Sequence, residues 1–362
     1  MQQKERVSVC LKYYKETGFL FCENKNKTIH IFFHTNITNT NCRKLFVLRI
    51  IDINKEAPSK GMVATMGFFD GVHLGHRHLI SQVVSEAKRL GQESAVITFP
   101  VHPRKVLDKN YQPPLLCGFD EKLEQLSTTE IDNCIVLDFT LSISQLSAKE
   151  FIQQILKDKI GVQTLIVGYD HRFGHNREEG FEDYVRYGQE VGINVIQATA
   201  YKFGSHTVSS SQIRYLLAQG DISLSNTFLS YNYTITGKII EGYQMGRRIG
   251  FPTANIKLWE RYKVIPTDGV YAVRVHIEES IHDGMLYIGN RPTLHENSHT
   301  SVEVNIFDFD EDLYNRTLTV EFVAFVRPDI KFNGVEPLIA QINKDKETVK
   351  EKLKGYDSKL RQ

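Results

Sequence analysis

The sequence has few cysteines and no long apolar run, and each absence excludes a class of protein. Only five cysteines occur among 362 residues, and no two are spaced as C-x-x-C. The odd number and this spacing argue against a disulfide framework and a zinc ribbon, and they favour reduced thiols. The longest apolar stretch near the start, Leu45 to Ile53, is interrupted by Arg49 and Asp52 and is too short to span a bilayer. We therefore expect a cytoplasmic protein with no signal peptide and no membrane partner.

An excess of charge of one sign is also absent. Lys and Arg total 44 against 43 Asp and Glu, which gives a net charge of +1. No global field attracts nucleic acid, so we expect no nucleic-acid partner and expect anionic ligands to be bound by local arrangements. The sequence contains neither a G-x-x-x-x-G-K-[ST] loop nor a protein-kinase catalytic loop. Any phosphoryl transfer must therefore use another framework.

The length and the hydrophobic pattern predict two domains. From Met62 to about residue 218, short β-branched runs alternate with helical patterns, which predicts a parallel, doubly wound α/β sheet of the Rossmann-like type. Ser147 and Glu150 are spaced as a capping box at one helix start, and Gly91 is placed to end another helix. We expect strands at 62–67, 94–99, 134–138, 164–168 and 194–198, and helices at 77–90, 147–160, 178–190 and 210–218.

The pattern changes to period-two alternation after about residue 228, as in Tyr271, Val273 and Val275. This predicts a small antiparallel β-barrel, closed by an amphipathic C-terminal helix over 335–353. We assign 47–228 to the α/β domain and 229–362 to the barrel domain. Residues 1–46 are rich in Asn, Thr and Lys, fit neither pattern and are taken as a loosely ordered N-terminal extension of unassigned function.

A glycine-rich turn with two histidines joins the first predicted strand to the first predicted helix. Its sequence, from Gly67 to His76, is G-F-F-D-G-V-H-L-G-H. Glycines let the backbone approach a triphosphate, the helix dipole favours its charge, and the imidazoles can donate hydrogen bonds to oxygens that gain charge. Taken alone, H-x-x-H also fits an ordinary turn or a zinc pair. The candidate ATP-binding residues are Gly67, Phe68, Asp70 and Gly71, and the candidate catalytic residues are His73 and His76.

Three further segments end at the same predicted sheet edge, where open α/β sheets bind ligands. Ser209 and Gln212 are spaced as a capping box, and Arg214 in the following turn is a cation near the positive end of a helix, which favours a phosphate there. His102 lies in T-F-P-V-H-P and Asp170 in V-G-Y-D-H-R-F-G. Taken singly, each of these two residues also fits a simple turn.

The predicted barrel offers a second constellation in a glycine-rich loop, G-Y-Q-M-G-R-R-I-G-F-P-T-A-N, over residues 242–255. Gly246 and its neighbouring glycines allow a flap to close over phosphates, and Arg247 adds positive charge. Thr253 and Asn255 offer neutral oxygens to Mg²⁺. A mobile basic hairpin is the alternative interpretation.

Glu303 is the candidate base of the barrel. Strand alternation places it opposite the apolar set Val302, Val304 and Ile306, so it could face a cleft, although an exposed surface glutamate is the common case. The acidic run that follows is not an EF-hand, because Leu313 and Thr319 occupy the positions that require glycine and glutamate. It is interpreted as a hairpin.

Together these motifs resemble the bacterial bifunctional riboflavin kinase/FAD synthetase family. The motifs G-F-F-D-G-V-H-L-G-H, T-F-P-V-H-P, V-G-Y-D-H-R-F-G and S-S-S-Q-I-R are similar to its adenylyltransferase half. The motifs G-Y-Q-M-G-R-R-I-G-F-P-T-A-N, I-G-N-R-P-T, V-E-V-N-I-F-D-F-D and R-P-D-I-K-F are similar to its riboflavin kinase barrel, which has six strands in a Greek-key arrangement.

The resemblance implies a role for each matched residue. His73 and His76 would contact ATP phosphates, with Ser210 and Arg214 completing the triphosphate site. Thr253 and Asn255 would serve Mg²⁺ and ATP, and Glu303 would take the proton from the ribityl 5′-hydroxyl of riboflavin. The residues implied in flavin binding are Asp170, His102 and Arg327.

The implied reactions are phosphorylation of riboflavin to FMN and adenylylation of FMN to FAD. The small-molecule partners would be riboflavin, FMN and ATP, with Mg²⁺ as cofactor. Two alternatives stay open: an enzyme with one working activity, and a flavin-binding regulatory protein without turnover. The sequence leaves the oligomeric state open.

Overall fold

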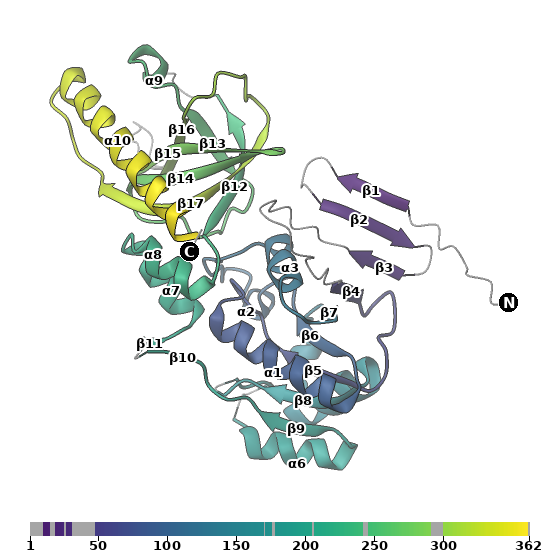
Figure 1. Ribbon diagram of the computed structural model, residues 1–362. Coiled ribbons are helices and arrows are strands. Elements are labelled where there is room, and N and C mark those ends of the chain that lie inside the picture. Colours follow the sequence, from purple (N-terminus) through teal and green to yellow (C-terminus); the bar gives the residue numbers. More distant parts are fainter. Residues whose placement is uncertain are drawn as a thin grey trace. The chain divides into compact units, whose positions relative to one another are not determined.

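The computed structural model describes residues 10–14, 19–24, 27–30, 48–169, 171–175, 178–204, 206–241, 245–290 and 300–360 (Figure 1). The chain forms two compact units. The first comprises Met1–Pro113 and Cys117–Val208, and the second comprises Pro114–Leu116 and Ser209–Gln362. Among the helices in these described ranges, none combines the length and apolar character that a membrane span requires.

A nine-stranded sheet forms the centre of the first unit, in the order β1-β2-β3-β4-β7-β6-β5-β8-β9. Its parallel strands confirm the predicted doubly wound α/β fold; they are β4 (Leu48–Asp52), β5 (Met62–Met66), β6 (Ser94–Thr98), β7 (Asn133–Val136), β8 (Val162–Val167) and β9 (Asn194–Gln197). Three antiparallel strands that the sequence did not predict extend one edge beyond β4; they are β1 (Cys10–Tyr14), β2 (Phe19–Asn24) and β3 (Lys27–His30).

Helices cover both faces of this sheet because strand residues alternate between two apolar clusters. Val63, Val96, Cys134 and Ile166 face the cluster that contains α1 (Leu74–Leu90) and α3 (Phe119–Ser127). Ala64, Ile97, Ile135 and Leu165 face the opposite cluster, which contains the π-type helix η1 (Phe151–Ile160) and α6 (Phe181–Val191). Short elements complete the unit: α2 (Pro103–Leu107), α4 (Leu141–Ser144), α5 (Ala148–Glu150), β10 (Lys202–Phe203) and β11 (His206–Thr207).

The helix ends show how closely the sequence pattern determines local structure. Ser147 and Glu150 form the predicted capping box at the start of α5. Gly91 ends α1 with a φ of 65°, a left-handed conformation that glycine adopts readily. Helix α1 begins at Leu74, three residues before the predicted start, because the side chain of His73 caps it.

A closed six-stranded barrel forms the centre of the second unit, in the order β12-β13-β16-β15-β14-β17, which confirms the predicted barrel. Its strands are β12 (Thr234–Ile240), β13 (Ala254–Leu258), β14 (Gly269–Ile277), β15 (Ser280–Asn290), β16 (Thr300–Ile306) and β17 (Thr317–Pro328). The accompanying helices are α7 (Ser210–Ala218), α8 (Ile222–Leu229), α9 (Met245–Arg248) and α10 (Val335–Leu360).

Helix α10 lies along one side of the barrel (Figure 1). Val349 and Leu353 of this helix pack against Ala272 and Val323, which therefore belong to the outer face of the barrel wall. Because neighbouring residues in a strand point to opposite faces, the fully buried Tyr271 and Val273 point into the barrel.

A three-residue segment, Pro114–Leu116, belongs to this second unit although it is far from the barrel in sequence. The N–H of Leu115 donates to the carbonyl of Tyr262 at 2.8 Å, and the N–H of Val264 donates to the carbonyl of Leu115 at 2.8 Å. The Nε of Arg214 in α7 donates to the carbonyl of Pro114 at 2.7 Å. Backbone hydrogen bonds therefore join Leu115 to Tyr262 and Val264, and a side-chain hydrogen bond joins Pro114 to Arg214.

Candidate functional site

The turn between β5 and α1 has an unusual backbone. Phe69 has a φ of 54° and Val72 a φ of 36°, both in the left-handed region that such residues rarely adopt, and Gly71 between them has a φ of 77°. A positive φ is a genuine outlier for a bulky or β-branched residue, and strain of this kind clusters at functional sites. The carboxylate of buried Asp70 accepts from the N–H of Cys117 at 3.2 Å, and the N–H of Gly71 donates to the Cys117 sulfur at 3.0 Å. These two contacts hold the strained turn in place.

His73 and His76 lie face to face, with ring centroids 3.7 Å apart and planes 17° apart. The Nδ1 of His73 accepts from the N–H of His76 at 3.4 Å, so a neutral His73 ring has its proton on Nε2. Burial, and then the neighbouring His73 and Lys122, hold the pKa of His76 well below its ordinary value. His76 is therefore neutral near pH 7, and its buried Nδ1 has no hydrogen-bond partner among the described residues.

Gly75 lies in a crowded position between these histidines and a neighbouring segment. A Cβ at this position would lie 3.2 Å from two atoms of the His73 ring and 3.2 Å from the carbonyl oxygen of Val208. Both distances are shorter than an ordinary van der Waals contact. The glycine of H-L-G-H thus lets the start of α1 approach the segment that leads to α7.

The loop after β6 meets the loop after β5 through aromatic rings. The ring of His102 contacts the edge of Phe68, with centroids 4.7 Å apart. The Nδ1 of His102 accepts from the N–H of Arg104 at 3.2 Å and so caps α2. The structure therefore brings together the first two motifs found in the sequence.

Two residues at this turn were missed in the sequence: Cys117, described above, and Lys122. Lys122 is only 1% exposed, and its ammonium lies 3.1 Å from the carbonyl oxygen of Phe99 and 3.9 Å from the centre of the Phe68 ring. The available signal was its position in the apolar stripe of α3, beside Leu123 and four residues before Leu126.

The remaining candidates for the adenylyl-transfer site are less fully described. Ser210 begins α7, where the hydroxyl of Ser209 accepts from the N–H of Gln212 at 3.2 Å, as the capping pattern predicts. Arg214 donates to Pro114, as described above. Asp170 lies outside the described residues. The phosphate and flavin roles of these residues stay predictions.

In the barrel, Glu303 of β16 lies between two hydroxyl groups. Thr253 Oγ1 donates to Glu303 Oε2 at 3.0 Å, and Ser301 Oγ donates to Glu303 Oε1 at 3.0 Å. Asn255 on β13 and Tyr287 on β15 lie directly opposite Glu303 in the two neighbouring strands, so all three share the outer face of the barrel. Ser301 was not singled out in the sequence, although its place two residues before Glu303 puts both side chains on one face.

The end of the 242–255 loop is fixed to this face. The N–H of Phe251 donates to the carbonyl of Gly246 at 2.8 Å, and the amide of Asn305 donates to the carbonyl of Pro252 at 2.7 Å. A Cβ on Gly246 would lie 2.2 Å from the carbonyl oxygen of Phe251, so only glycine fits this turn. The side chain of Arg247 lies outside the described residues.

Tyr287 and Arg327 each make a further side-chain contact in the barrel unit. The hydroxyl of Tyr287 donates to Asp329 at 3.1 Å, and burial together with that carboxylate raises the pKa of Tyr287 to about 12. Arg327, a predicted flavin-binding residue, pairs with the buried carboxylate of Asp345 at 2.8 Å and so fastens β17 to α10. Its role toward flavin stays a prediction.

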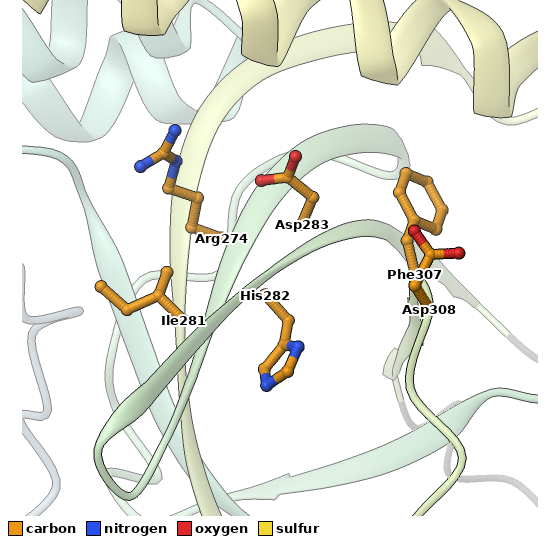
Figure 2. Close-up of a pocket in the computed structure, with 6 residues that line it drawn as sticks. All are labelled: Arg274, Ile281, His282, Asp283, Phe307 and Asp308. Carbon is orange, nitrogen blue, oxygen red and sulfur yellow. The ribbon is translucent and has the colours of Figure 1, made fainter.

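A surface pocket lies elsewhere on the barrel, at the hairpin that joins β14 to β15 (Figure 2). Figure 2 shows His282 and Asp283 pointing to opposite sides of their strand. None of the residues predicted to act on a substrate lines this pocket, which is formed by Arg274, Ile281, His282, Asp283, Phe307 and Asp308. Within the part of the chain that the structure describes, no group of three or more His, Cys, Asp or Glu side chains could hold a metal ion.

These features define a two-domain transferase. Its α/β domain has the strained turn that leads into H-L-G-H at the start of α1, and its barrel holds a carboxylate between two hydroxyls. Residues 55–212 match the family model for FAD synthetase, and residues 229–353 match the family model for riboflavin kinase.

Curated relatives agree with both matches. The bifunctional riboflavin kinase/FMN adenylyltransferase of Listeria monocytogenes is 38% identical, over 82% of this chain and 91% of that protein. The enzymes of the same name from Bacillus subtilis and Escherichia coli K12 are 34% and 33% identical, over 81% and 84% of this chain and 92% and 97% of theirs. A crystal structure described as a macrolide-efflux protein from Streptococcus pneumoniae has a TM-score of 0.75 at 27% identity, covering 84% of this chain and 98% of that chain.

The chain belongs to the family of bifunctional riboflavin kinase/FMN adenylyltransferases. It contains both the riboflavin kinase and the FAD synthetase domain, so the predicted family and the predicted pair of transferase domains are confirmed.

Proposed function

We propose that this protein phosphorylates riboflavin to FMN at Glu303 and adenylylates FMN to FAD at the His73–His76 turn, with ATP as co-substrate in both steps. The assignment of 47–228 to adenylyl transfer and of 229–362 to the kinase is part of the proposal. The main support is the carboxylate of Glu303, whose two oxygens each accept a hydroxyl hydrogen bond at 3.0 Å on the outer barrel face. A carboxylate held in this way is oriented to accept a proton.

In the kinase step, Glu303 takes the proton from the ribityl 5′-hydroxyl of riboflavin while the oxygen attacks the γ-phosphorus of ATP. ADP is the leaving group. The fixed turn at Gly246 and the loop that ends at Thr253 form a flap over the phosphates. Arg247 supplies positive charge to the same phosphates, and Arg327 borders the flavin.

Thr253 and Asn255 would hold Mg²⁺ in this site. Their side-chain oxygens, together with the adjacent Glu303 carboxylate, are the hard oxygen donors that Mg²⁺ prefers, so the residues present fit the ion. When bound, Mg²⁺ offsets the negative charge of the phosphates. Thr253 also donates to Glu303, so it orients the base as well as the nucleotide.

In the adenylylation step, a phosphate oxygen of FMN attacks the α-phosphorus of ATP and pyrophosphate leaves. The Nε2–H of His73, the His76 ring and the start of α1 stabilise the charge that develops on the phosphates. The loop residues Gly67, Phe68, Asp70 and Gly71 shape the turn that receives them, and Ser210 and Arg214 bind the triphosphate. Asp170 and His102 bind the flavin nucleotide.

The test is to incubate the pure protein with riboflavin, ATP and Mg²⁺ and to separate the flavins chromatographically over time. FMN should appear first and FAD should follow. FMN without FAD, or FAD only when FMN is supplied, would leave one working activity. Flavin binding without any product would favour the regulatory protein.

A further inference from the structure

Lys122 is a buried cation on a helix face that otherwise buries apolar side chains. It is 1% exposed, in the stripe of α3 that also contains Leu123 and Leu126. Removing an ammonium group from water is costly, and a methionine of similar length could fill the same space without that cost. Packing alone therefore does not explain a lysine at this position.

The contacts of Lys122 join two loops of the α/β domain, the one after β5 and the one after β6. Its ammonium donates to the carbonyl of Phe99 at 3.1 Å, and it lies 3.9 Å from the centre of the Phe68 ring. Phe99 follows β6 and leads to His102, whereas Phe68 follows β5 and leads to His73. A single charged group thus holds the starts of both loops.

Lys122 also interacts electrostatically with charged and titratable groups of the turn that carries His73 and His76. The carboxylate of Asp70 favours the charged ammonium, while burial opposes it and lowers the pKa of Lys122. The thiols of Cys117 and Cys134 also interact with the ammonium. Burial raises the pKa of each thiol to about 12, so both stay neutral, and the charge of Glu121 also raises the pKa of Cys117. His76 stacks on His73; after burial, which is the largest cause, positive charge on His73 and on Lys122 also lowers the pKa of His76.

We propose that Lys122 is a positioning residue for adenylyl transfer: its ammonium fixes the Phe68 and Phe99 loops, and its positive charge acts on the turn that carries His76. The role rests on the proposed function of His76. It differs from substrate binding because the ammonium is enclosed by protein groups. The cation also explains why the turn contains a buried carboxylate, Asp70, that already accepts a backbone N–H.

The test compares Lys122→Met with a matched control, Lys159→Met, which removes an exposed lysine at the end of η1. The pKa of His76 is measured by NMR titration, with the resonance assigned from a His76→Gln variant. In Lys122→Met we expect this pKa to rise, while burial and His73 still hold it below its ordinary value of about 6.5. We expect FAD formation from FMN to fall about 10-fold or more, because the loops lose their common anchor. Riboflavin phosphorylation should stay at the parent rate, and Lys159→Met should change none of the three.

An unchanged His76 pKa in folded Lys122→Met overturns the proposal, as does FAD formation at the parent rate. Removing one of two opposite buried charges can prevent folding. The Asp70→Asn/Lys122→Met double variant, which removes both charges, is then compared with Asp70→Asn alone, and the proposal requires a higher His76 pKa in the double variant. If the parent protein forms no FAD, the proposed function fails, whereas the NMR measurement still decides the effect of Lys122 on His76.

Discussion

Replacing Glu303 by Gln separates chemistry from packing in the barrel. The side chains have nearly the same size, and both Glu303 oxygens accept a hydroxyl, from Thr253 and from Ser301. In the variant, the amide oxygen can still accept from one hydroxyl, while the amide N–H₂ can donate to the other, which rotates to accept. Both contacts survive, so we expect the thermal stability to stay close to that of the parent.

The basicity of the group does not survive. Loss of a general base typically lowers turnover by about 10²- to 10⁴-fold, which corresponds to about 3 to 5.5 kcal/mol in the activation barrier. Formation of FMN from riboflavin should fall by this factor at any pH near neutrality. FAD formation from added FMN and ATP should continue at close to the parent rate, because the histidine turn belongs to the other domain.

The assay follows FMN and FAD by chromatography from riboflavin and, separately, from FMN. Glu351→Gln, which changes an exposed glutamate of α10, is the matched control and should leave both rates unchanged. If Glu303→Gln phosphorylates riboflavin at the parent rate, Glu303 is a surface residue without a chemical role. Loss of both activities in a folded variant would contradict separate sites.

Three further substitutions or deletions test other parts of the fold. His76→Ala should lower FAD synthesis about 10²-fold or more and spare riboflavin phosphorylation, as parallel assays would show; equal loss of both would refute the assignment. Ser301→Ala should lower the kinase kcat about 10-fold with an unchanged KM for ATP, because the charged base loses a hydroxyl hydrogen bond. Ser301→Thr, which keeps a hydroxyl, should restore kcat. Deleting residues 1–46 should leave both activities within a few-fold of the parent, because β4 keeps its four residue pairs with β7 and loses only the two described with β3. Loss of folding, seen by circular dichroism, would contradict this prediction.

Much of the architecture follows from local patterns in the sequence. Alternating β-branched runs and amphipathic stretches were enough to predict every parallel strand except β4, and α7 spans the predicted residues, Ser210–Ala218. The start of α1 was predicted three residues late because histidine is an uncommon helix cap. Strands β1–β3 were missed because the Asn, Thr and Lys content of residues 1–46 was taken as a sign of loose order, although segments such as CLKYY and FLFCEN contain aromatic residues that favour strands.

The arrangement of the predicted barrel residues depends on a contact between positions distant in sequence. Thr253 and Glu303 are 50 positions apart, and only the register between β13 and β16 brings them together. Without that register, Ser301 is one more polar residue on a strand. Lys122 was missed because lysine is almost always exposed, so its place in an apolar stripe was the single available signal.

The pairing of Pro114–Leu116 with the barrel segment around Tyr262 has a consequence for dissecting this enzyme. The chain passes from one compact unit to the other three times, at 113/114, 116/117 and 208/209, rather than once at a single linker. A gene fragment that starts near residue 229 would encode a barrel without the short segment bonded to Tyr262 and Val264, and without α7 and most of α8. Point substitutions such as Glu303→Gln and His76→Ala are therefore a cleaner way to separate the two activities than expression of either half alone.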